Sequence, residues 1–240
     1  MIIIPDIHGR NFWKNAVKGH ENEEIVFLGD YVDPYYFLEN VDTWYGLDSL
    51  SEVIDFKKAH PDNVTLLLGN HDLSYLSDHI VQCRHDDENH DEIRSLLLQN
   101  IHLFKIAHEK RVGDKNYVFS HAGILPNWLE QNDSVLGKIR PGHEVEELNR
   151  LFQAGKLYQA LGNVSSYRGG AFEYGSCIWA DIHEHLDCEL YDESSAYHDV
   201  YQIFGHTLQL NERPVVTEHF ACVDCRHAFL LDDNGTLTRI

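Results

Sequence analysis

Short apolar runs rich in β-branched residues recur along the chain, and each of them ends in a group of polar residues. The runs cover residues 1–4, 25–28, 64–68, 117–119 and 200–204. A short apolar run bounded by glycine, aspartate or asparagine is typical of a buried strand that ends in a loop. The pattern therefore predicts five buried strands, each followed by a polar loop.

Helices are predicted between the first strands. We expect strands over about 1–5, 24–28 and 63–68, and helices over about 11–19 and 46–59. In this part of the chain, segments with the apolar pattern of a strand alternate with segments whose apolar residues have the spacing of a helix. The last forty residues, in contrast, are rich in predicted strands.

The middle of the chain is predicted to be mostly helical. A helical stretch over 72–110 is interrupted by the acidic, histidine-rich segment 85–91. A hairpin follows with its turn at Gly113-Asp114, and residues 126–161 return to helix with a break at Pro141-Gly142.

The order of the predicted elements indicates the fold class, because strands and helices alternate early in the chain and strands dominate near its end. We expect an α/β protein in which mixed central sheets are flanked by helices. Neither an internal repeat nor a low-complexity linker divides the chain. The sequence therefore predicts a single domain over residues 1–240.

Five motifs with metal-ligand residues occupy the predicted strand ends. They are Asp6-Ile7-His8-Gly9, Gly29-Asp30-Tyr31-Val32-Asp33, Gly69-Asn70-His71-Asp72, Ser120-His121-Ala122-Gly123 and Gly205-His206-Thr207. In open α/β sheets the carboxyl ends of neighbouring strands converge on one crevice. Any one of these motifs alone is typical of a turn or a helix cap. Five in a consistent order, each after a strand, indicate a pair of divalent metal ions bound by carboxylate, amide and imidazole groups.

The spacing assigns the candidate ligands to two ions. Asp6 and His8, two residues apart on one loop, can chelate the first ion. Asp30, at the next strand end, can bridge both ions through its two carboxylate oxygens. The second ion is completed by an amide oxygen and two imidazoles, from Asn70, His121 and His206.

Composition narrows the class of protein. Of the 240 residues, 43% are apolar and 24% are charged, which is ordinary for a globular protein. The formal net charge of −20 argues against a nucleic-acid backbone as a partner, because such binding depends on clustered lysines and arginines. No apolar run is long enough to span a membrane, and no signal-peptide pattern opens the chain. We therefore expect a cytoplasmic protein without a membrane partner.

The five cysteines are expected to be free thiols. An odd number of cysteines in a chain without an export signal argues against disulfides. Cys222 and Cys225 form a lone C-x-x-C within a strand predicted over 218–231. We interpret this pair as buried core thiols.

The order of the five motifs resembles that of the calcineurin-like metallophosphoesterase superfamily. Within it, the chain is similar to the branch of bacterial serine/threonine protein phosphatases and symmetrical diadenosine tetraphosphate hydrolases, over residues 1 to about 235. The resemblance implies a metallophosphoesterase sandwich that holds two divalent ions, with manganese favoured over iron or zinc. It implies Asp6, His8 and Asp30 on one ion, and Asp30, Asn70, His121 and His206 on the other.

The same resemblance implies hydrolysis of phosphate monoesters by a hydroxide that bridges the two ions. His71, next to the ligand Asn70, would protonate the leaving group as a general acid. Asp33 would hold the His71 ring in the right tautomer. The substrate would be a phosphorylated small molecule, a nucleotide or a phosphoprotein.

One departure from the family concerns the arginine that binds the substrate phosphate. The family's protein phosphatases usually carry Arg-Gly directly after the position of Asp33, where this chain has Pro34-Tyr35. Arg168 is the best replacement, because the two glycines after it let the backbone approach a ligand closely. Weaker candidates are Arg84 and Arg10.

The substrate stays open between two classes. The segments 68–73 and 121–128 resemble symmetrical diadenosine tetraphosphate hydrolases, but those enzymes typically lack a carboxylate at the position of Asp33. Hydrolysis of a dinucleoside polyphosphate is therefore the alternative to hydrolysis of a phosphate monoester. A third hypothesis is a metal-binding protein that keeps the fold without the chemistry. It predicts gaps among the ligands, and the sequence has none.

Overall fold

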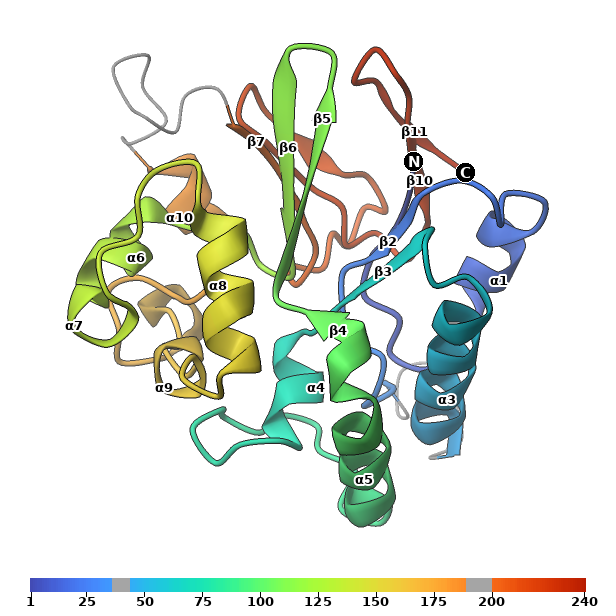
Figure 1. Ribbon diagram of the computed structural model, residues 1–240, viewed down its shortest axis with the longest axis horizontal. Coiled ribbons are helices and arrows are strands. Elements are labelled where there is room, and N and C mark those ends of the chain that lie inside the picture. Colours follow the sequence, from blue (N-terminus) through green and yellow to red (C-terminus); the bar gives the residue numbers. More distant parts are fainter. Residues whose placement is uncertain (36–43, 189–199) are drawn as a thin grey trace.

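Two mixed sheets form the centre of the computed structural model, which describes residues 1–35, 44–188 and 200–240 (Figure 1). In these ranges the first sheet has the strand order β11-β10-β1-β2-β3-β4. Its strands are β1 (Ile2–Ile4), β2 (Ile25–Phe27), β3 (Val64–Leu67), β4 (Phe104–Lys105), β10 (Phe229–Leu231) and β11 (Leu237–Arg239). Strands β1 to β4 pair in parallel, whereas β10 and β11 pair antiparallel.

The second sheet has the order β5-β6-β7-β9-β8 in the same part of the chain. Its strands are β5 (Ala107–Val112), β6 (Lys115–Ser120), β7 (Val200–Phe204), β8 (Val215–Val216) and β9 (Phe220–Cys222). Strands β6, β7 and β9 are parallel, with antiparallel strands at both edges. The two sheets explain why the apolar runs of the sequence end in loops on one side of the molecule, since the parallel strands all point the same way within each sheet.

An apolar cluster fills the space between the sheets. Ile3 and Val26 of the first sheet and Phe119 and Ile203 of the second belong to it, and each is at most 1% exposed. Side chains alternate along a strand, so Ile2 next to Ile3 faces the opposite side and packs with the helices. Burial on both faces explains why these strands read as continuous apolar runs.

Helices cover the outer faces of the two sheets (Figure 1). The first sheet is covered by α1 (Phe12–Val17) and α3 (Trp44–Ala59), and α5 (His90–Asn100) packs on α3. Beside the second sheet lie α6 (Pro126–Gln131), α7 (Asp133–Leu136), α8 (Glu144–Gln153), α9 (Tyr158–Leu161) and α10 (Ile182–Leu186). The predicted α/β fold, with mixed sheets flanked by helices, is confirmed. Among the described residues, no helix combines the length and the apolar character needed to cross a membrane.

The predicted helical stretch over 72–110 is wrong at its end. Helices are α4 (Asn70–Ser74), α5 and the 3-10 turn η1 (Ile101–Leu103), but residues 104–105 and 107–112 are the strands β4 and β5. β5 pairs along its whole length with β6, so hydrogen bonds to a neighbouring strand decide its conformation. The predicted hairpin turn at Gly113-Asp114 is confirmed, because β5 and β6 flank it.

The predicted strand over 218–231 is also wrong, because it is two strands in different sheets. β9 ends at Cys222 in the second sheet, and β10 begins at Phe229 in the first. Residues 223–228 cross between the sheets, and Arg226 has a φ of 62° there, which no strand allows. Cys222 and Cys225 are nevertheless fully buried free thiols, as the sequence predicted.

Candidate functional site

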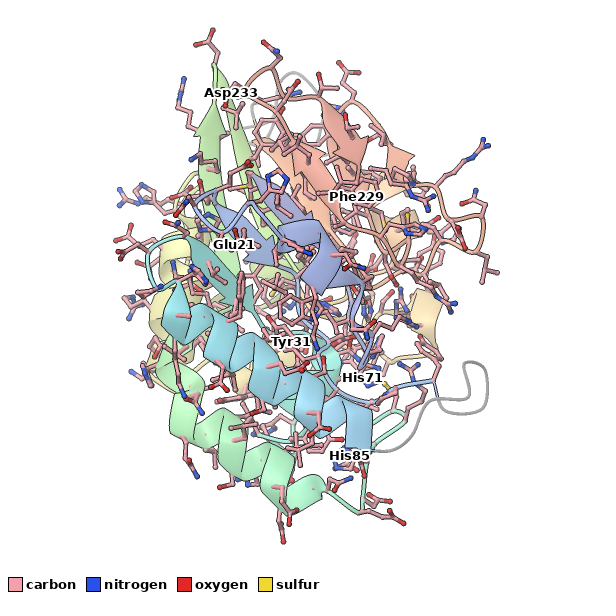
Figure 2. The ribbon with its side chains drawn as sticks, turned by 90° about the vertical axis from the view of Figure 1, so that its right-hand side faces the viewer. Glu21, Tyr31, His71, His85, Phe229 and Asp233 are labelled. Atoms are coloured by element: carbon pink, nitrogen blue, oxygen red, sulfur yellow. The ribbon has the colours of Figure 1, made fainter. Side chains whose placement is uncertain are left out.

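The five motifs meet where the parallel strands of both sheets end. The loops after β1, β2, β3, β6 and β7 bring together the predicted metal ligands Asp6, His8, Asp30, Asn70, His121 and His206. These residues are at most 5% exposed, apart from His206, which is half-buried. Figure 2 shows Tyr31 and His71, from the ends of β2 and β3, on the same side of the molecule.

Asp30 lies at the centre of this group. Its Oδ2 atom is 3.5 Å from Nε2 of His8 and 3.4 Å from Nε2 of His121. Its Oδ1 atom accepts a hydrogen bond of 3.0 Å from the backbone N–H of His71. One carboxylate therefore faces imidazoles from two different loops, as a bridging ligand must. Both imidazoles lie nearest the same oxygen, whereas the sequence analysis expected one oxygen of Asp30 for each ion.

Asp72 holds the loop that carries Asp30, a role that the sequence analysis missed. The buried carboxylate of Asp72 accepts hydrogen bonds from the backbone N–H groups of Asp30 (2.7 Å), Tyr31 (2.9 Å) and Gly69 (2.9 Å). Asp30 has a φ of 52°, a left-handed conformation that is unfavourable for a residue with a side chain. The bonds to Asp30 and Tyr31 hold this conformation, and the bond to Gly69 ties the same carboxylate to its own turn. The only signal of this role in the sequence is the place of Asp72 in the third motif.

The rings of His8 and His121 are oriented by backbone carbonyl groups. Nδ1 of His8 lies 2.9 Å from the carbonyl oxygen of Val32, and Nδ1 of His121 lies 2.9 Å from that of Leu28. A carbonyl oxygen only accepts hydrogen bonds, so each Nδ1 carries the ring proton. Each Nε2 then presents its lone pair towards Asp30, which is the arrangement of a metal-ligating histidine.

A second group of ligand atoms surrounds Nε2 of His121. This atom lies 3.1 Å from Oδ1 of Asn70 and 3.1 Å from Nδ1 of His206. Within the described ranges, Nε2 of His206 is buried without a hydrogen-bond partner. The donor set of two imidazoles, the Asn70 amide and the Asp30 carboxylate fits a divalent metal ion.

In the ranges that the structure describes, potential ligand atoms form two clusters that share Asp30. His8, Asp30 and His71 form one, and Asp30, His121 and His206 form the other, with the ligand atoms of each cluster within 4.8 Å of one another. Asp6, predicted on the first ion, is in neither cluster, and its two carboxylate oxygens both lie 3.1 Å from the backbone N–H of His206. The assignment of Asp6 to the first ion stays a prediction.

Burial shifts three of these groups towards their neutral forms. It lowers the pKa of His8 and of His206 well below the usual range, and neighbouring positive charges act in the same direction. It raises the pKa of the Asp30 carboxyl well above its usual range. Neutral imidazoles are the form that binds metal, and a bound cation would restore the charge of Asp30.

His71 and Asp33 form the predicted pair. Nδ1 of His71 lies 2.6 Å from Oδ2 of Asp33, and the hydroxyl of Tyr75 donates a hydrogen bond to Oδ1 of Asp33. Burial raises the pKa of Asp33 to about 7 and lowers the pKa of His71 to about 4. Tyr75 was missed by the sequence analysis. Its signal is the four-residue spacing from His71, which puts both side chains on one helical face.

Two of the three candidate arginines, Arg168 and Arg84, have different surroundings. The Arg168 guanidinium donates a hydrogen bond of 2.6 Å to Oγ1 of Thr207, and its Nε lies 3.3 Å from Oδ2 of Asp181. Arg168 therefore lies against the loop of the fifth motif. Arg84, the weaker candidate in the sequence, lies nearer to the first cluster, because its Nη2 is 3.3 Å from Nε2 of His8.

Asp224 is a further carboxylate that the sequence analysis missed. It follows β9, is 4% exposed, and lies on the same side as the ends of β1 and β7. Burial raises the pKa of the Asp224 carboxyl well above its usual range, Asp6 raises it further, and Arg10 and Arg226 act in the opposite direction. Its signal, a carboxylate after an apolar run, was hidden because the segment was predicted to be one strand.

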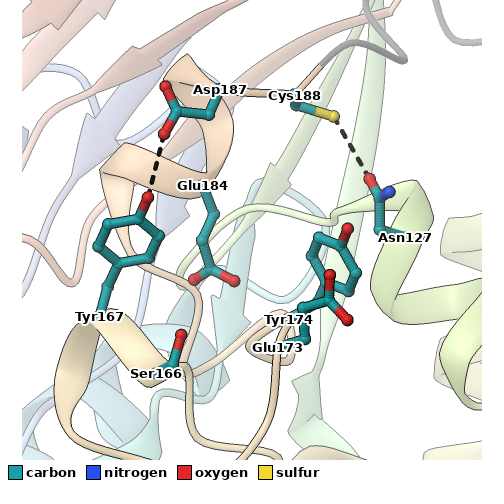
Figure 3. Close-up of a pocket in the computed structure, with 8 residues that line it drawn as sticks. All are labelled: Asn127, Ser166, Tyr167, Glu173, Tyr174, Glu184, Asp187 and Cys188. Carbon is teal, nitrogen blue, oxygen red and sulfur yellow. Dashed lines mark hydrogen bonds between the residues drawn. The ribbon is translucent and has the colours of Figure 1, made fainter.

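A cavity of about 520 Å³ lies next to the segment that carries Arg168 (Figure 3). Two tyrosines and three carboxylates are among its lining residues: Asn127, Ser166, Tyr167, Glu173, Tyr174, Glu184, Asp187 and Cys188. Tyr167, next to Arg168 in the chain, donates a hydrogen bond of 3.1 Å to Asp187. The cavity contains none of the predicted metal ligands.

The order of the motifs resembles that of the calcineurin-like metallophosphoesterase superfamily. No family model matches it. A stretch of 100 residues is 34% identical to the symmetrical bis(5'-nucleosyl)-tetraphosphatase of Nitrosospira multiformis. The matched stretch covers 39% of this chain and 34% of that protein. The match thus spans about a third of the length of this curated relative.

Solved structures share the fold. A cold-active protein-tyrosine phosphatase of a psychrophilic Shewanella species has a TM-score of 0.59 and 16% sequence identity, covering 99% of this chain and 79% of that chain. A second structure of a cold-active protein tyrosine phosphatase has a TM-score of 0.57, also at 16% identity, and covers 99% and 77%. At this level of identity the likeness establishes the fold alone.

Proposed function

We propose that this chain is a metal-dependent phosphoesterase that hydrolyses phosphate monoesters at a dinuclear centre. The observation that carries the proposal is the convergence of His8 and His121 on the carboxylate of Asp30, with both Nε2 lone pairs directed towards it. The relative in Nitrosospira and the fold shared with phosphatases support a phosphoesterase. The serine/threonine phosphatases of the family are the nearest analogy for the reaction.

The residues at the site are suited to hold two divalent ions. One would be held by Asp6, His8 and Asp30, and the other by Asp30, Asn70, His121 and His206. Such ions supply positive charge that activates a water molecule and neutralises the phosphate oxygens. Manganese is favoured, with iron and zinc as alternatives. In a chain with a net charge of −20, local positive charge is needed to attract an anionic substrate.

The side chains around the predicted ions have separate tasks. His71, with its Nδ1 held by Asp33, would protonate the departing oxygen from Nε2, which requires the ring to take up a proton although burial lowers its pKa to about 4. Asp33 would keep the His71 ring in one orientation, and Tyr75 would keep Asp33 in place. Arg168 would bind the oxygens of the substrate phosphate through its planar guanidinium.

Two other functions remain as alternatives. The similarity to the tetraphosphatase of Nitrosospira favours hydrolysis of a dinucleoside polyphosphate as the second candidate. A metal-binding protein without catalytic activity is the third. The single domain over 1–240 and the cytoplasmic location expected from the sequence stay predictions.

A metal-reconstitution assay tests the proposal. The purified chain is dialysed against a chelator, supplied with manganese, iron or zinc, and assayed on p-nitrophenyl phosphate, a phosphopeptide and diadenosine tetraphosphate. We expect activity on the two monoesters that returns only with metal. Activity on diadenosine tetraphosphate alone would select the second candidate, and metal binding without turnover of any substrate would select the third.

Asp30→Asn is the diagnostic variant, because it removes a charge from the shared ligand. We expect it to retain clearly less metal and to have almost no activity. The matched control is Asp55→Asn, at an exposed position of α3. An Asp30→Asn protein with the metal content and turnover of the control would show that the site is assigned wrongly.

A further inference from the structure

Three arginines from distant parts of the chain surround the ring of Tyr35. Arg10 follows the first motif, Arg84 lies between α4 and α5, and Arg226 lies between β9 and β10. Their guanidinium carbons are 5.3, 3.6 and 5.9 Å from the centre of the Tyr35 ring. A cation over an aromatic face is attracted by the ring, so Tyr35 can hold the three positive groups in one place.

This arginine group adjoins the candidate metal centre. The Tyr35 ring meets the His8 ring edge-on, with 5.2 Å between the ring centres. Arg84 extends further, with Nη2 at 3.3 Å from Nε2 of His8 and 3.4 Å from Nε2 of His71. A ligand bound by the arginines would therefore lie next to a phosphate bound at the candidate metal centre.

Charges of both signs meet around Tyr35. Three arginines gather there. Burial raises the pKa of the Tyr35 hydroxyl, which Arg84 lowers, and the carboxylates of Asp224, Asp6 and Asp30 also act on this hydroxyl and raise its pKa. Arg84 is exposed, and Arg10 and Arg226 are half-buried, so all three are within reach of solvent. Burial raises the pKa of the Asp224 carboxyl, and Arg10 and Arg226 lower it. Asp224 is 4% exposed, so its carboxylate is shielded from solvent.

Guanidinium groups are the side chains best suited to phosphate. Each presents a planar fork of N–H donors that matches two phosphate oxygens, and several such groups together favour a ligand with several negative charges. A single phosphate at the metal centre would use only the arginine nearest to it. Three arginines around one ring indicate a second anionic group.

We propose that Arg10, Arg84 and Arg226 form a second anion subsite beside the candidate metal centre, which binds a further phosphoryl group of the substrate. The preferred substrates would then carry at least two phosphoryl groups close together. This inference rests on the proposed function for the position of the reacting phosphate. Recognition of the second phosphoryl group, in contrast, depends on the arginines alone.

Competition between adenosine monophosphate and adenosine diphosphate tests the subsite. Both nucleotides are used, with saturating metal, as inhibitors of p-nitrophenyl phosphate hydrolysis and as ligands in calorimetry. We expect the diphosphate to bind at least tenfold more tightly than the monophosphate. Equal affinities would overturn the proposal. Because calorimetry needs no turnover, a chain that fails to hydrolyse p-nitrophenyl phosphate would refute the proposed function and still test the subsite.

Charge-removing variants assign the preference to the arginines. Arg10→Gln and Arg226→Gln are expected to reduce the ratio of the two affinities by at least fivefold each. Arg10→Lys and Arg226→Lys keep the charge but not the planar fork of N–H donors. We expect these variants to fold normally and to have a ratio of the two affinities between those of the wild type and the glutamine variants. Arg111→Gln, on the distant hairpin of β5 and β6, is the control. An unchanged ratio in the glutamine variants would contradict the subsite.

Discussion

The buried carboxylate of Asp33 has a different partner on each oxygen. His71 occupies one oxygen and Tyr75 the other, so Asp33 cannot rotate without losing a hydrogen bond. An imidazole fixed in this way keeps its second nitrogen directed at one place. At the scale of single residues, the chemistry of the proposed reaction depends on this fixed ring.

His71→Asn tests general acid catalysis. Loss of a general acid typically lowers the rate by about 10²–10⁴-fold, and most for a poor leaving group. We expect kcat on phosphoserine to fall by that factor and kcat on p-nitrophenyl phosphate to fall much less, because its leaving group needs little protonation. His79→Asn, at an exposed position of the next loop, is the control. Equal losses on both substrates would indicate a role in metal binding or folding.

The short helix α4 and the turn before it deliver more of the site than any other described element. Asn70 and His71 come from its first turn, and Asp72 fixes the neighbouring loop. The turn needs glycine at position 69, because a Cβ atom there would lie 2.1 Å from Oδ1 of Asp30 and 2.7 Å from Cε1 of His121. Two loops can approach this turn closely only because Gly69 has no side chain.

Gly69→Ala is therefore expected to displace Asp30. Overpacking of this kind typically lowers the free energy of unfolding by about 1–3 kcal/mol. We expect that loss in urea unfolding, together with a loss of bound metal and of activity. The control is Gly113→Asn, in a hairpin turn with open space and a φ of 59° that asparagine tolerates. Gly69→Ala with the metal content of the wild type would mean that Asp30 does not depend on this contact.

At the scale of the whole molecule, an ionic contact joins the two sheets. Glu24 precedes β2 in the first sheet, and its carboxylate lies 3.0 Å from Nε2 of His108 and also contacts Lys110, both in β5 of the second sheet. The hydrogen bond from His108 and the charge of Lys110 outweigh burial and lower the pKa of Glu24 to about 2. The charged carboxylate therefore favours the packed arrangement of the sheets.

The pKa of Glu24 predicts a pH dependence of stability. Because the pKa in the folded state lies below the unfolded value of 4.5, the stabilisation is complete above pH 4.5 and disappears as the pH falls towards 2. Glu24→Gln should lower the free energy of unfolding by about 1 kcal/mol at pH 7. The difference from wild type should shrink between pH 4.5 and 2, measured by urea unfolding. Glu109→Gln, exposed on the same strand as His108, should show no such trend.

The sequence by itself determined the strand ends and the residues placed there. Apolar runs next to glycine, aspartate and histidine are local patterns, and a parallel strand buried on both faces must end where such polar groups begin. For this reason the local patterns alone predict that Asp30, His71 and His121 are neighbours. The mixed sheets flanked by helices follow from the same alternation.

Only the tertiary structure decided what surrounds those residues. The contacts of Tyr75, Asp224 and the arginines around Tyr35 are with residues far away in the sequence, so no local pattern records them. Residues 107–112 became a strand because β6 offered hydrogen bonds along their whole length, and residues 218–231 divided because each half paired in a different sheet. Pairing between separate segments leaves no periodic signal in a single stretch of sequence, so the fold decides it.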